Sequence, residues 1–61
     1  MPLRKAVKEN RYEIAVFLVE SGMRPDPERD IDLLYVALEN KWTSMFQLLL
    51  PFFDLNRGGY E

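Results

Sequence analysis

The sequence predicts an all-α fold made of two stacked helix–turn–helix hairpins with an extended loop after each hairpin. Apolar residues recur at helical spacing in four short segments, which are separated by polar or proline-rich stretches. The two halves of the chain also match when one is shifted by 31 positions. Identical residues then coincide at three places: Leu3 with Leu34, Ala6 with Ala37, and Leu18 with Leu49. Apolar residues coincide at four more: Val7 with Leu38, Ile14 with Met45, Phe17 with Leu48, and Val19 with Leu50.

The length and composition predict one small domain, residues 1–61, of marginal stability, because a chain of this size buries only about 60% of its unfolded surface. The chain has no Cys and no His, so we expect no disulfide, no metal site and no cofactor. The longest apolar run, LLLPFF at 48–53, is far shorter than the ~20 residues of a membrane span. The N-terminus lacks the apolar stretch of a signal peptide. We expect an intracellular protein, cytoplasmic or nuclear, that does not bind membranes.

The first hairpin is predicted from its capping residues. Pro2 suits the first turn of a helix. Asn10 and Glu13 have the spacing of a capping box, which would begin the second helix, and Gly22 is placed to end it. The segment RPDPERD at 24–30 is expected to be irregular because its two prolines fix the backbone.

The second hairpin repeats this order. Asp30 or Asp32 would cap a third helix over 33–38, and Thr43 or Ser44 would cap a fourth. Pro51 would end the fourth helix or kink its last turn. The remaining segment, FDLNRGGYE, is expected to be extended and rich in turns.

These residues resemble the ankyrin repeat. The matches to its pattern in the first unit, residues 2–27, are Pro2, Leu3, Ala6, Glu13, Ile14, Leu18 and Gly22. Those in the second unit, residues 30–57, are Leu34, Ala37, Leu48, Leu49 and the triplet at 54–56. Asn10 and Lys41 replace the usual turn glycine, and the loop is about two residues shorter than in the common repeat. The resemblance implies a helical solenoid pair, with a generic four-helix miniature as the alternative fold.

Catalysis is not expected, because nucleophile–base pairs of the usual kind need Cys or His. Asp30 and Asp32 could form a catalytic carboxylate pair, but both lie in the polar loop, and we expect them to be solvated helix caps. Nucleic-acid binding is not expected either, since residues 1–29 carry a net +1, residues 30–61 a net −3, and neither second helix is basic.

A binding surface is the remaining possibility, and the resemblance places it on the inner helices and loop tips. Positions 4, 8 and 11 share one helical stripe, and positions 35, 39 and 42 repeat it 31 residues on. The predicted partner-binding residues are Arg4, Lys8, Arg11, Arg29, Tyr35, Glu39 and Trp42. A solvated helix face would also explain the basic stripe, and Trp42 could pack over the turn instead.

The predicted function is therefore a non-catalytic module that binds a partner polypeptide. Two repeats leave two outer faces uncovered, and stable arrays usually have three or more repeats. Phe52 and Phe53 lie near the end where no third repeat follows, and we expect them to be packing groups, either in the core or in a self-association surface. The alternative function is thus a self-associating structural unit, a homo-oligomer, or a fragment of a longer repeat array.

Overall fold

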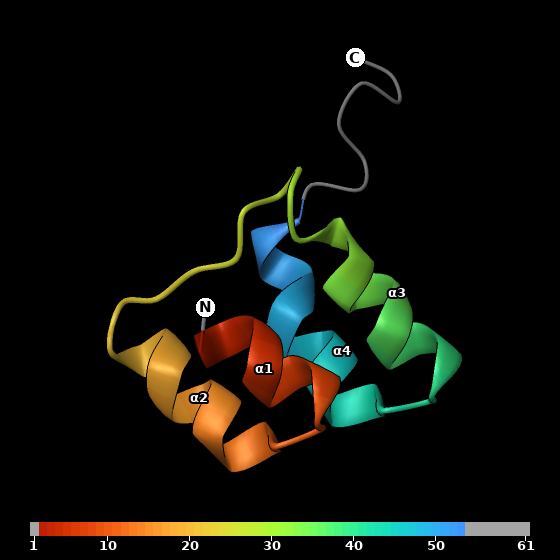
Figure 1. Ribbon diagram of the computed structural model, residues 1–61, viewed down its shortest axis with the longest axis horizontal. Helices are drawn as coiled ribbons and strands as arrows, with labels where there is room; N and C mark the ends of the chain where they lie inside the picture. Colours follow the sequence, from red (N-terminus) through yellow and green to blue (C-terminus); the bar gives the residue numbers. More distant parts are fainter. Residues whose placement is uncertain (1, 54–61) are drawn as a thin grey trace.

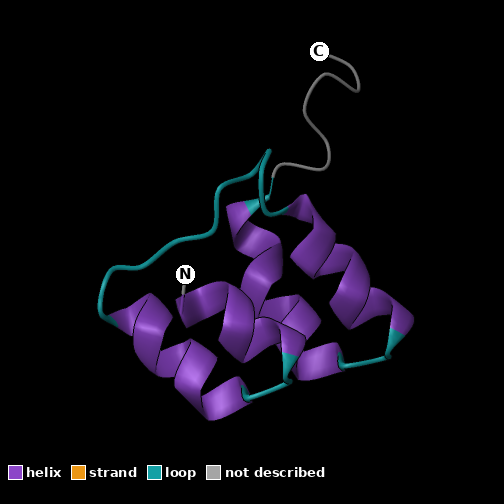
Figure 2. Ribbon diagram, in the orientation of Figure 1, coloured by secondary structure: helices purple, strands orange, loops and turns teal. Residues whose placement is uncertain are grey.

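The computed structural model describes residues 2–53. Four α-helices follow one another along the chain: α1 (Pro2–Lys8), α2 (Tyr12–Glu20), α3 (Ile31–Glu39) and α4 (Thr43–Leu49). A short 3₁₀ helix, η1 (Leu50–Phe52), continues from α4. Figure 1 shows the hairpin of α1 and α2 beside that of α3 and α4, with the loop between α2 and α3 arching over one edge. The described residues contain helices and loops but no strand (Figure 2), which confirms the predicted all-α class.

The turn of the first hairpin is a Schellman motif, in which a left-handed residue closes the end of α1. Asn10 has φ 56°, and its N–H donates to the carbonyl of Val7 at 3.0 Å. The N–H of Arg11 reaches back to the carbonyl of Ala6 at 2.8 Å. These bonds satisfy carbonyls that the helix end would otherwise leave without a donor.

The second hairpin turns in the same way, 31 residues later. Lys41 has φ 60°, and its N–H donates to Leu38 at 3.1 Å. The N–H of Trp42 donates to Ala37 at 2.9 Å. The two turns therefore have the same pattern of backbone hydrogen bonds, 31 residues apart.

The predicted N-caps of α2 and α4 are wrong, whereas α3 begins after Asp30, one of the two residues predicted to cap it. The N-cap residues are Arg11, Asp30 and Trp42, and none of the three makes a side-chain capping bond. The reason is that each Schellman turn uses the position before the N-cap for its left-handed residue, so Asn10 ends α1 and does not begin α2. The carboxylate of Asp30 is bound elsewhere, as described below.

Two predicted helix ends are confirmed. Gly22, at φ 106°, closes α2 with a third Schellman motif, in which the N–H of Met23 donates to Leu18 at 3.0 Å. The α-helix α4 stops at Leu49, and Pro51 lies in the tighter turn of η1. The end of the second predicted repeat at 57 and the extended exit at 54–61 lie outside the described residues.

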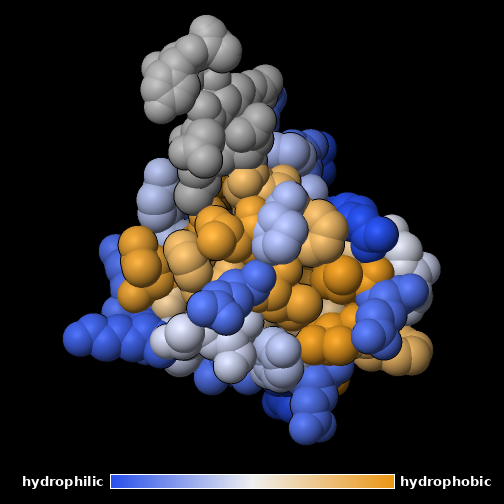
Figure 3. Space-filling model, turned by 180° about the vertical axis from the view of Figure 1, so that it is seen from behind, coloured by the Kyte–Doolittle hydropathy of each residue, from blue (hydrophilic) through white to orange (hydrophobic). Residues whose placement is uncertain are grey.

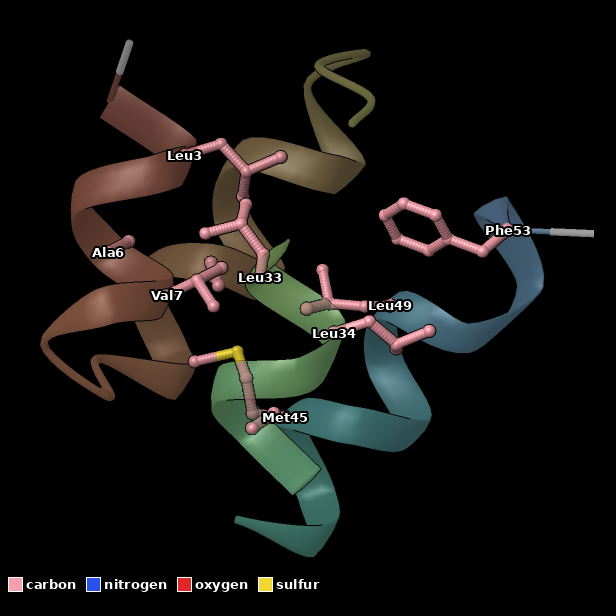
Figure 4. Packing of buried hydrophobic residues seen from close by; sticks show 10 residues of the cluster. Leu3, Ala6, Val7, Leu33, Leu34, Met45, Leu49 and Phe53 are labelled. Carbon is pink, nitrogen blue, oxygen red and sulfur yellow. The ribbon is translucent and has the colours of Figure 1, made fainter. Parts of the chain in front are cut away.

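The core lies between the two hairpins, where α1 packs on α3 and α2 packs on α4. Its buried apolar side chains come from all four helices and from the end of η1 (Figure 4). They are Leu3, Ala6, Val7, Ala15, Leu33, Leu34, Ala37, Met45, Leu49 and Phe53. Each hairpin thus supplies one wall of a core that neither could enclose alone.

Candidate functional site

The first helix of the predicted binding stripe is tied to the second hairpin by an ion cluster. The guanidinium of Arg4 donates from Nη1 and Nη2 to both oxygens of Asp32, at 3.0 and 2.9 Å. Nη1 also donates to Oδ1 of Asp30 at 2.9 Å. The Nζ of Lys8 lies 3.8 Å from Asp32, on the same side. Arg4 is thereby held in a fork between two carboxylates, which fixes α1 against the start of α3.

Asp30 connects this cluster to the loop between the hairpins. Its side chain is 2% exposed, and its second oxygen accepts the N–H of Asp26 at 2.8 Å. Asp26 in turn accepts the N–H groups of Glu28 and Arg29, at 2.8 and 3.1 Å. The buried carboxylate therefore has a donor on each oxygen, which a buried charge needs to be stable. Its burial fixes the course of the loop.

The charges in the cluster stabilise one another. The hydrogen bond from Arg4 lowers the pKa of Asp32, and the bonds to Asp32 and Asp30 raise the pKa of Arg4. In the loop, the N–H groups of Arg29 and Glu28 lower the pKa of Asp26. The carboxylates of Asp26 and Asp32 therefore favour the ionised form, as structural ion pairs do.

Arg11 is directed toward its own hairpin. Its Nε donates to Glu9 at 2.9 Å, and Lys5 contacts the other oxygen of Glu9 at 3.1 Å. The hydrogen bond from Arg11, followed by that from Lys5, lowers the pKa of Glu9. Arg11 is nevertheless 60% exposed, as is expected of a surface ion pair that contributes little to stability.

The aromatic members of the predicted site lie in different surroundings. Tyr35 is 57% exposed on α3, one helical turn beyond Asp32, and Glu39 is exposed one turn further on. Trp42 is half-buried and packs against the core. It lines a hollow between the two turns together with Asn10 and Tyr12. Tyr35 therefore lies one helical turn from the carboxylate that Arg4 and Lys8 contact, whereas Trp42 packs at the start of α4.

The predicted self-association residues are largely covered by the chain itself. Phe53 is 5% exposed and points from the end of η1 toward the core (Figure 4). Phe52 is half-buried, with the guanidinium of Arg24 5.2 Å from its ring centre. Arg24 also donates to the carbonyl of Val19 at 2.8 Å, at the end of α2. Phe53 therefore packs as a core residue and offers little surface to a second copy.

Exposed apolar side chains lie elsewhere, at positions that the sequence analysis did not select. Phe17 is 67% exposed, Leu38 56% and Ile14 46%. Figure 3 shows apolar side chains gathered across the middle of the face opposite that of Figure 1. The 31-residue match did not separate these positions, because Leu3 and Leu34 are both buried whereas Leu38, the equivalent of the buried Val7, is exposed.

Within residues 2–53, no group of three or more acidic, His or Cys side chains is placed to hold a metal ion. None of the helices in this part of the chain is long and apolar enough to cross a membrane.

Comparison of the chain with protein-family models, with curated proteins and with solved structures gives no match.

Proposed function

We propose that this chain is a non-catalytic interaction module of the ankyrin type, which binds a partner polypeptide on the face formed by α1 and α3. The observation that carries the proposal is Tyr35, an aromatic side chain 57% exposed on α3. It lies one helical turn from the cluster of Arg4, Lys8 and Asp32. Tyr and Arg are enriched among the residues that dominate the energetics of protein interfaces.

The ankyrin-type interpretation is supported by the repeated backbone. Both turns use one left-handed residue followed at once by the N-cap of the next helix, in Asn10–Arg11 and in Lys41–Trp42. Such a turn brings the two helices of each hairpin close together and leaves α1 and α3 side by side. The rigid ion pairs of Arg4 then hold the proposed face in one shape, which reduces the ordering cost of binding.

The test is a photo-crosslinking amino acid placed at position 35, with the same group at Glu20 on α2 as the matched control. We expect position 35 to capture a foreign polypeptide that the control does not. With that partner purified, Tyr35→Ala should weaken binding about tenfold or more, whereas Glu20→Ala should leave it unchanged. If Arg11→Ala and Trp42→Ala also weaken partner binding, the binding surface includes the two turns. Equal capture at positions 35 and 20 would contradict the proposal.

A further inference from the structure

The contact between the two hairpins leaves an equivalent surface uncovered on the second one. In the first hairpin, Val7 and Ala15 are both 0% exposed and belong to the core between the two hairpins. Their equivalents 31 residues on are Leu38, which is 56% exposed, and Phe46, which is only half-buried. The side chains around Leu38 and Phe46 line an open hollow of about 410 Å³. They are Ala37, Leu38, Lys41, Thr43 and Phe46, which correspond one by one to Ala6, Val7, Asn10, Tyr12 and Ala15.

The first hairpin has the complementary face uncovered. In the second hairpin, Met45 is 1% exposed because it is buried against the first. Its equivalent, Ile14, is 46% exposed and lines an open hollow with Lys5 and Glu9. Phe17, at the position equivalent to the half-buried Leu48, is 67% exposed. The molecule therefore carries both halves of its own internal contact, one at each end.

We propose that these two ends bind each other between copies of the chain. The end surface around Leu38 and Phe46 of one copy receives Ile14 and Phe17 of the next, and the new contact repeats the contact between the two hairpins. The inference is independent of the proposed partner face, because it uses neither Tyr35 nor the Arg4 cluster.

The charges favour a second copy as the occupant. At the internal contact, Asn10 and Ser44 line the same hollow from opposite hairpins. Between copies, the equivalent positions are Lys41 of one copy and Glu13 of the next. A neutral pair inside the molecule thus becomes a pair of opposite charges between molecules, which favours this orientation of the two surfaces.

The geometry determines what kind of assembly forms. The two surfaces differ, so the contact is heterologous, and each added copy presents a new uncovered end. Association should therefore continue beyond the dimer as the concentration rises, instead of stopping at a closed pair.

The test uses two variants that each block one end, Leu38→Lys and Ile14→Lys, in sedimentation experiments up to millimolar concentration. Each substitution places a lysine on an exposed apolar position, so both variants should keep the helical circular dichroism of the wild type. Alone, each variant should associate about tenfold more weakly than the wild type, or worse. Mixed, they should form a one-to-one dimer and stop there, because each retains the end that the other lacks. Tyr35→Lys, at an equally exposed site away from both ends, should assemble like the wild type.

The charge pair gives a second test that does not depend on the apolar substitutions. Lys41→Glu should weaken association, and adding Glu13→Lys to it should restore association. A wild type that stays monomeric at millimolar concentration would overturn the proposal and leave a third repeat or a foreign chain as the occupant of these faces. A mixture of the two lysine variants that fails to dimerise would overturn the head-to-tail geometry.

Discussion

The two hairpins share a backbone but differ in which of their apolar side chains are buried. Both hairpins turn through a left-handed residue, at Asn10 and at Lys41. In each turn an alanine carbonyl, that of Ala6 or of Ala37, accepts a backbone N–H from the turn. Yet Ile14 is 46% exposed where Met45 is 1% exposed. The difference teaches that burial in a repeated fold is decided by the presence of a neighbour, and that the local sequence decides only which side faces that neighbour.

The largest expected effect comes from breaking this difference with the same substitution in each hairpin. Met45→Ala should lower the free energy of unfolding by about 2–5 kcal/mol, because it leaves a cavity in the core. Ile14→Ala, at the equivalent exposed position, should lower it by about 1 kcal/mol or less. Urea unfolding followed by circular dichroism at low protein concentration measures both. Equal losses in the two variants would show that the hairpins are not buried as described.

A smaller loss of stability is expected from breaking the ion cluster of Arg4, Asp30 and Asp32, which joins the two hairpins. Asp30→Ala removes a carboxylate that is 2% exposed and leaves the N–H of Asp26 and one N–H of Arg4 without their acceptor. The free energy of unfolding should fall by about 1.5–3 kcal/mol. Asp32→Ala, whose side chain is 48% exposed, is the matched control and should cost about 1 kcal/mol or less. The same urea experiment measures both losses. A greater loss for Asp32→Ala would show that the exposed Arg4–Asp32 pair stabilises the fold more than the buried Asp30 does.

The fold could be predicted from the sequence because it depends on periodic features. Helical spacing and the 31-residue match were enough for four helices in two hairpins, and Gly22 and Pro51 marked two helix ends. The N-cap of α3 was predicted at Asp30, but that of α2 could not be, since Asn10 favours both an N-cap and a left-handed turn and only the complete backbone decides between them.

The candidate site was harder to predict because it depends on contacts between distant residues. The helical stripe correctly placed Lys8 and Tyr35 on the surface, but nothing local indicated that Arg4 would be held by carboxylates 26 and 28 positions away. The sequence left Phe53 either in the core or in a self-association surface, and the backbone of η1 turns its ring into the core.

Acid should lower the stability that the ionised carboxylates of Asp32, Asp26 and Glu9 contribute to the folded chain. The folded state lowers the pKa of Asp32, chiefly through Arg4, and the pKa values of Asp26 and Glu9 as well. Below about pH 4.5 the unfolded chain therefore binds more protons than the folded one, so the free energy of unfolding should fall as the pH is lowered. Arg4→Met should reduce this dependence because Asp32 loses its main donor. Tyr35→Met, at the equivalent position of the second hairpin, should leave it unchanged. Urea midpoints across the acid range test the pair, and equal pH profiles for both variants would show that Arg4 does not set the dependence.

The smallest effect separates the two turns themselves. Asn10 and Lys41 have nearly the same φ, 56° and 60°, but Asn tolerates the left-handed region better than Lys does. Glycine adopts it without strain and adds entropy to the unfolded chain, so the two contributions oppose each other. Lys41→Gly should therefore raise the free energy of unfolding by about 0.5 kcal/mol, whereas Asn10→Gly should change it by about zero. Thermal and urea unfolding of the two variants, each checked against the wild type at one low concentration, measure the difference. A larger gain at Asn10 would mean that the first turn holds more strain than the second, although the two residues have nearly the same φ.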